Sequence, residues 1–136
     1  LDLRDEFEMG IILITHDMGV VAQMADRVAV MYSGEIVERA PAALLFQYPA
    51  HPYARLLMRA IPSARRALDH LPRIPGLMPA AGRFPEGCRF HPRCPISAAG
   101  CLQPSPPLLA VGDGHESRCL RHKDIRAGTF EKELQE

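Results

Sequence analysis

The stretch "RVAVMYSGEIVERA", residues 27–40, decides the fold because two runs of strand-forming residues flank a tight turn. Val28 to Met31 and Ile36 to Glu38 predict two strands, and Ser33-Gly34 between them predicts the turn of a β-hairpin.

The stretch before it, "IILITHDMGVV", residues 11–21, places a polar triplet between two apolar runs. Ile11 to Ile14 predicts a strand covered on both faces, as in a parallel sheet. Asp17 is a good N-cap for a following helix with one apolar face, formed by Met18, Val21, Ala22 and Ala25. Residues 1–9 suit the end of a surface helix, and this order of elements predicts an α/β fold.

His16 follows the predicted strand, at the edge where open α/β sheets bind ligands. An imidazole at that edge can donate a hydrogen bond to an anion near neutral pH. His16 is therefore a candidate functional residue. The triplet Thr15-His16-Asp17 alone favours instead a histidine that only satisfies backbone groups in a turn.

The character of the chain changes after the hairpin, since all 13 prolines lie between Pro41 and Pro107. Two short helices are predicted, around Ala42 to Phe46 and Tyr53 to Ala60. Residues 61–85 have no sustained period and predict an extended loop, and residues 123–136 predict a charged tail with one or two marginal helical turns.

Four cysteines lie in this Pro-rich region, with 5, 6 and 17 residues between successive members: Cys88, Cys94, Cys101 and Cys119. Two disulfides, a zinc ion or an iron–sulfur cluster would each staple such a loop. No pair has the C-x₂₋₄-C spacing usual for zinc, whereas an iron–sulfur cluster takes four thiolates and tolerates wider spacing. Four arginines close to the cysteines could offset the charge of a cluster: Arg89, Arg93, Arg118 and Arg121. His91 and His115 are alternative zinc ligands.

Composition limits the class of partner. Sixteen Lys and Arg balance sixteen Asp and Glu, so no basic footprint indicates nucleic acid as a partner. No apolar run is long enough to span a bilayer. Leu1 falls inside a predicted helix, and we expect the chain to be part of a longer protein.

The segment from Ile11 to Glu38 resembles the end of the ATP-binding domain of ABC transporters. In that family this segment carries the switch histidine, which contacts the γ-phosphate of ATP and helps arrange the attacking water. The resemblance implies this catalytic role for His16. The chain has no G-x-x-x-x-G-K-[ST] loop, "SGGQ"-like signature or strand ending in Asp-Glu. Sites for ATP and Mg²⁺ are therefore expected mostly outside these residues, and the chain alone is expected to be inactive.

Three further stretches resemble the oligopeptide/dipeptide (and nickel) branch of ABC importers: "FQYPAHPYARLLMRAIP" with His51-Pro52-Tyr53, "IPGLMP" and "GCRFHPRCP". We expect His51-Pro52-Tyr53 to be structural. The pattern C-x5-C-x6-C with a later cysteine is similar to a [4Fe–4S] site of several peptide-importer ATPases. That similarity implies cluster ligation by Cys88, Cys94, Cys101 and Cys119, with Zn²⁺ as the alternative. Disulfides fit poorly in a cytosolic ATPase module.

The resemblance implies an α/β fold, the C-terminal part of an ABC-type P-loop ATPase domain followed by an irregular, Pro-rich, cysteine-stapled extension. The expected divisions are 1–46 for the nucleotide-binding end, 47–122 for the extension and 123–136 for the tail.

The implied function is that of the C-terminal part of the ATP-binding subunit of a peptide importer. The expected partners are a second ATP-binding subunit and two transmembrane permease subunits, at the cytoplasmic face of the inner or plasma membrane. The alternative is a non-catalytic module that binds an iron–sulfur cluster or zinc and docks on a transporter ATPase.

Overall fold

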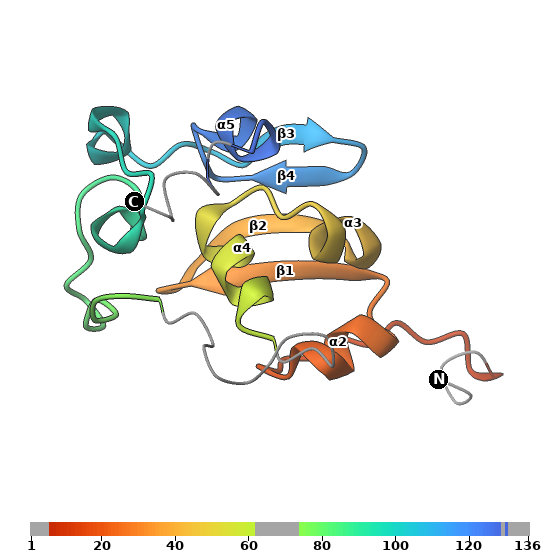
Figure 1. Ribbon diagram of the computed structural model, residues 1–136. Helices are drawn as coiled ribbons and strands as arrows, with labels where there is room; N and C mark the ends of the chain where they lie inside the picture. The colour runs from red at the N-terminus through yellow and green to blue at the C-terminus, as the bar shows by residue number, and fades with distance from the viewer. Residues whose placement is uncertain (1–5, 62–73, 129, 131–136) are drawn as a thin grey trace.

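A four-stranded antiparallel sheet forms the centre of the computed structural model, which describes residues 6–61, 74–128 and 130 (Figure 1). The strand order is β1-β2-β4-β3. Their bounds are Arg27–Tyr32 for β1, Glu35–Pro41 for β2, Leu109–Gly112 for β3 and His115–Ser117 for β4. The described residues thus form a mixed helix and sheet domain.

The predicted β1–β2 hairpin is confirmed. The strands pair from Arg27 opposite Pro41 to Tyr32 opposite Glu35. Both turn residues have positive φ, 48° at Ser33 and 79° at Gly34. Positive φ at both central positions is the mark of a type I′ turn, whose twist matches that of paired strands.

The β3–β4 hairpin was not predicted, and the expectation of a wholly irregular extension is wrong for residues 109–117. Strand β4 pairs with β2 through Glu38 opposite Ser117 and Arg39 opposite Glu116. An ion pair between the side chains of Arg39 and Glu116, 2.7 Å apart, stabilises the pairing of these two residues. Strands of three and four residues are too short to show a period. Their structure is determined by pairing, of β4 with β2 and of β3 with β4.

The strand expected at Ile11 to Ile14 is wrong: these residues form no strand, and Ile12 and Ile14 are 94% and 95% exposed. A strand needs a hydrogen-bonded neighbour, and none among the described residues pairs with this segment. The predicted N-cap is confirmed, because Asp17 Oδ1 accepts hydrogen bonds from the backbone N–H groups of Gly19 and Val20. The capped helix is α2, Met18–Met24. The helix expected at residues 1–9 lies partly outside the described residues.

Helices α3, Ala42–Gln47, and α4, Pro52–Arg59, confirm the two predicted helices, with α4 beginning one residue early. Both lie on one face of β1 and β2 (Figure 1). The core between helices and sheet includes Val37, Leu45, Leu56 and Phe90.

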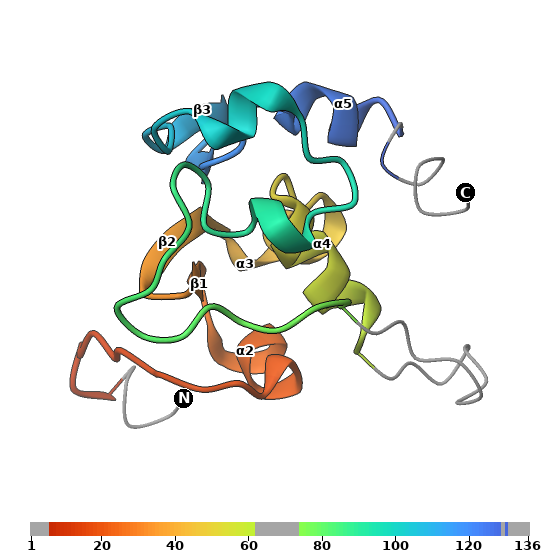
Figure 2. The same cartoon turned by 90° about the vertical axis from the view of Figure 1, so that its left-hand side faces the viewer.

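The end of the chain forms helix α5, His122–Arg126, which agrees with the one or two helical turns expected in residues 123–136. Ile125 and Phe130 are buried in the same core, so this part of the tail is anchored. Of the loop expected at 61–85, residues 74–85 contain no helix or strand, and 62–73 lie outside the described residues. Residues 74–102, green to teal in Figure 2, lie against the end of the sheet where β1 turns into β2.

The carboxylate of Glu38 joins three separate segments in the core. Its side chain is fully buried. Oε1 accepts hydrogen bonds from the Ala50 backbone N–H at 2.8 Å and from His115 Nε2 at 2.7 Å, and Oε2 accepts one from the His51 backbone N–H at 2.7 Å. Glu38 therefore fastens β2 to the turn before α4 and to β4.

Glu38→Gln should destabilise the fold strongly, because the amide group places an N–H where two backbone N–H groups and an imidazole need an acceptor. We expect a loss on the order of 3 kcal/mol in the free energy of unfolding, measured by urea denaturation. Glu116→Gln is the matched control. It removes only the partly exposed pair with Arg39 and should cost less than about 1 kcal/mol. Equal losses would contradict the central role of Glu38.

His51 gives the stability a defined pH dependence. Burial, with a smaller contribution from the charge of Arg118, lowers the pKa of His51 from 6.5 to about 3. Between these values the unfolded chain binds a proton that the folded chain does not, so stability falls as the pH falls. We expect His51→Asn to remove a slope of about 1.4 kcal/mol per pH unit from the unfolding free energy between pH 6 and 4. Identical slopes for wild type and variant would contradict this prediction.

Candidate functional site

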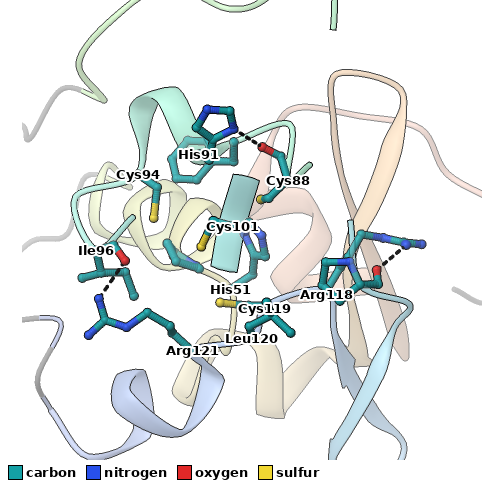
Figure 3. Close-up of a pocket in the computed structure, with 13 residues that line it drawn as sticks. His51, Cys88, His91, Cys94, Ile96, Cys101, Arg118, Cys119, Leu120 and Arg121 are labelled. Carbon is teal, nitrogen blue, oxygen red and sulfur yellow. Dashed lines mark hydrogen bonds between the residues drawn. The ribbon is translucent and has the colours of Figure 1, made fainter. Parts of the chain in front are cut away.

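The four cysteines line one cavity, although they come from separate parts of the chain. Cys88 precedes the short 3₁₀ helix η2, His91–Arg93, and Cys94 follows it. Cys101 lies within η3, Ala99–Leu102, and Cys119 follows β4. Figure 3 shows their sulfur atoms directed toward the same interior. The hollow is partly open to solvent, and all four thiols are free.

Backbone contacts hold two of the cysteines next to each other. The Cys88 backbone N–H donates to the Cys101 carbonyl at 3.0 Å. Gly87 makes this approach possible: it has φ of 73°, and a Cβ there would lie 2.3 Å from the Cys101 carbonyl oxygen. His91 adds a contact between Nδ1 and the Cys88 carbonyl oxygen at 3.0 Å.

The sheet positions the fourth cysteine. Arg118, directly before Cys119, donates from its backbone N–H to the Val37 carbonyl at 2.8 Å. Its guanidinium donates to the carbonyls of Ile36 and Pro106. Cys119 is therefore fixed by β2 and β4, whereas the other three cysteines belong to the loop.

The arginines near the cysteines divide into two pairs. Arg118 and Arg121 line the cavity. Arg89 instead donates to the Ser33 carbonyl and stacks on the ring of Phe84. Arg93 donates to the carbonyls of Ile74 and Pro75 and to the Tyr32 hydroxyl. Arg89 and Arg93 thus do not line the cavity; they attach the loop to the β1–β2 turn.

The cavity wall is largely apolar and keeps the thiols of Cys88, Cys94 and Cys119 neutral. Burial raises the pKa of Cys94 and of Cys119 to about 12, and it raises the pKa of Cys88 as well. Such thiols are poor nucleophiles. A bound cation would reverse this preference by displacing the thiol protons.

In the part of the chain that the structure describes, no three His, Cys, Asp or Glu side chains form a group that could hold a metal ion. The four thiols nevertheless face one hollow. Arg118 and Arg121 also line it. The side chains that could bind a metal in this hollow are therefore the four cysteines. Their positions do not form a site for a single metal ion.

His51 also lines this cavity, which the sequence did not indicate. Its side chain is 1% exposed, and Nδ1 accepts a hydrogen bond from the Tyr53 backbone N–H at 3.1 Å, so His51 caps α4. The expected structural role of His51 is borne out by this cap. A histidine directly before Pro52 at a helix start was the available signal, but it does not reveal where the ring points.

His16 lies away from the cysteines, in a second hollow. It directly precedes Asp17, the cap of α2. The hollow is bounded by the start of α2 and the end of α4, with Leu57, Ala60 and Ile61 on the α4 side. The His16 side chain is exposed. The structure thus separates the two sets of candidate residues.

Among the described residues, no helix combines the length and apolar character needed to cross a bilayer.

Comparisons with known proteins show what the chain is similar to. Residues 37–101 match the family model described as "Oligopeptide/dipeptide transporter, C-terminal region". A protein of Brucella abortus named as a peptide import ATP-binding protein is 48% identical over 118 residues, which are 87% of this chain and 35% of that protein. A protein of Brucella ovis with the same description is 41% identical over 131 residues, 92% of this chain and 39% of that protein. The chain thus spans little more than a third of the length of these relatives. Residues 37–101 are thus similar to the C-terminal region of oligopeptide/dipeptide transporters.

Proposed function

We propose that the chain acts within the ATP-binding subunit of an ABC importer that couples ATP hydrolysis to peptide uptake. The observation that carries the proposal is the family match of residues 37–101, together with relatives named as peptide import ATP-binding proteins. In this function the subunit works at the cytoplasmic face of the membrane with a second ATP-binding subunit and two transmembrane permease subunits. Residues 1–46 end the nucleotide-binding domain, 47–122 form the extension, and 123–136 the tail.

In this proposal His16 contacts the γ-phosphate of ATP. Its exposed imidazole follows the segment Ile11 to Ile14 and precedes the capped start of α2. From there it can reach a nucleotide whose phosphates and Mg²⁺ are held by groups beyond these 136 residues. The chain alone then has no ATPase activity.

His16→Ala in the full-length subunit should lower ATP turnover on the order of 100-fold, because the group that orients the attacking water is lost. Nucleotide binding should be largely unchanged, since His16 acts on only one phosphate. Turnover is measured by phosphate release and binding by fluorescence titration. Gln23→Ala, on exposed surface of α2, is the control. Unchanged turnover in the histidine variant would remove the case for a switch role.

We further propose that the cysteine cavity holds a [4Fe–4S] cluster, with Zn²⁺ as the alternative. Support comes from the four thiols around one hollow and from the two guanidiniums in its wall, Arg118 and Arg121. A bound cluster would supply four-point ligation and one-electron redox chemistry. The protein's own part is positional: Gly87 and the Cys101 carbonyl hold Cys88, and the sheet holds Cys119. Ligation would fasten the loop to β4.

Anaerobically purified full-length protein should be brown and contain iron and acid-labile sulfide. Cys119→Ser should lower the iron content several-fold and reduce thermal stability, because it removes the ligand that joins the loop to the sheet. Ser97→Ala, in the same loop but exposed, should leave both unchanged. Stoichiometric zinc without iron would favour the alternative ion, and protein with neither metal would reject the site.

The second candidate function is a non-catalytic metal-binding module that docks on a transporter ATPase. The lack of a phosphate loop in these 136 residues favours it. A full-length protein that fails to bind ATP would support this module over the ATPase.

A further inference from the structure

The hollow beside His16 has two walls that come from distant parts of the chain. One wall is the start of α2 with the residues just before it, and the other is the end of α4. The residues that line the hollow are His16, Asp17, Met18 and Gly19 on the first side and Leu57, Ala60 and Ile61 on the second. The extension therefore supplies one of the two walls around the candidate catalytic histidine.

The wall at the start of α2 is fixed by hydrogen bonds on both sides of His16. The Asp17 backbone N–H donates to Thr15 Oγ1 at 3.0 Å. Asp17 Oδ1 accepts from the backbone N–H groups of Gly19 and Val20 at 2.8 and 3.2 Å. These three bonds hold the backbone around His16, but none of them involves its exposed imidazole. The orientation of the ring is therefore limited by the opposite wall.

The wall at the end of α4 is attached to the core. At the start of this helix, the His51 backbone N–H donates to the buried Glu38 carboxylate at 2.7 Å. At its end, the Ala60 backbone N–H donates to the carbonyls of Leu56 and Leu57 at 3.1 and 3.2 Å. Leu56 is itself buried in the core. Helix α4 therefore presents Ala60 to the hollow from a fixed position.

We propose that the end of α4 positions His16 for ATP turnover. The methyl group of Ala60 leaves space for the imidazole, while the larger side chains of Leu57 and Ile61 limit the orientations from which the ring reaches the γ-phosphate. The inference rests on the proposed switch role of His16. It goes beyond that role because it makes the extension part of the machinery for ATP turnover. Such positioning matters, since a misplacement of about 1 Å can cost on the order of 100-fold in rate.

Filling the hollow in the full-length subunit tests this positioning role. Ala60→Phe places a ring in the space of the imidazole, so we expect kcat for ATP turnover to fall roughly 10-fold or more, with the KM for ATP changed less than about 2-fold. Met58→Phe is the matched control. It enlarges a partly exposed side chain of the same helix that does not line the hollow, and it should leave both constants unchanged.

Thermal unfolding of both variants shows whether the larger side chain disturbs the fold. If Ala60→Phe lowers the melting temperature strongly, Ala60→Met tests the same wall with a flexible side chain. It should lower kcat less than the phenylalanine does. Ala60→Ser adds a single oxygen atom and should keep kcat close to that of the wild type.

A double-mutant cycle separates positioning of His16 from general damage to the subunit. In a His16→Ala background, Ala60→Phe should cause no further loss of turnover, because the ring that it displaces is absent. Equal losses in the two backgrounds, or wild-type kcat in the folded Ala60 variants, would overturn the positioning role of α4 and leave the switch role of His16 intact. Full turnover in His16→Ala alone would overturn both proposals.

Discussion

The structure depends on a buried negative charge that is shared by three donors. Burial of a carboxylate is costly unless hydrogen bonds replace its water, and Glu38 has the Ala50 and His51 backbone N–H groups and His115 Nε2 as replacements. All three donors lie outside β2, in the turn before α4 and in strand β4. The charge is satisfied only when the turn before α4 and strand β4 are both in place. This mutual requirement explains how a strand of three residues becomes a fixed part of the sheet.

The elements that could be predicted from the sequence are those with local causes. The type I′ turn at Ser33-Gly34, the Asp17 cap and the two short helices follow from residue types within a few positions. Strands β3 and β4 have no such signal, because β4 depends on pairing with β2 and β3 on pairing with β4. Ile11 to Ile14 shows the converse: its composition predicts a covered strand, but among the described residues nothing covers or pairs with it.

The same distinction holds for the candidate sites. Shared thiol chemistry was enough to predict that the four cysteines belong together, and they line one hollow. The orientation of long or ring side chains was not predictable, since it depends on partners distant in sequence. Arg89 and Arg93 turn toward the β1–β2 hairpin, whereas His51 turns toward the cysteines. Helix α4 connects the two hollows, since His51 and Pro52 at its start line the first, and Leu57 and Ala60 near its end line the second.

The β3–β4 hairpin also determines how the sheet ends. Without it, β2 would present a free edge able to recruit a strand from another molecule. With it, the outer strand is β3, which has four residues and an irregular register between Ala110 and Gly112. The Val111 carbonyl is occupied by the guanidinium of Arg126. The hairpin therefore protects this edge of the sheet from pairing with a strand of another molecule, which would lead to aggregation. It does so although its segment has the composition of a loop.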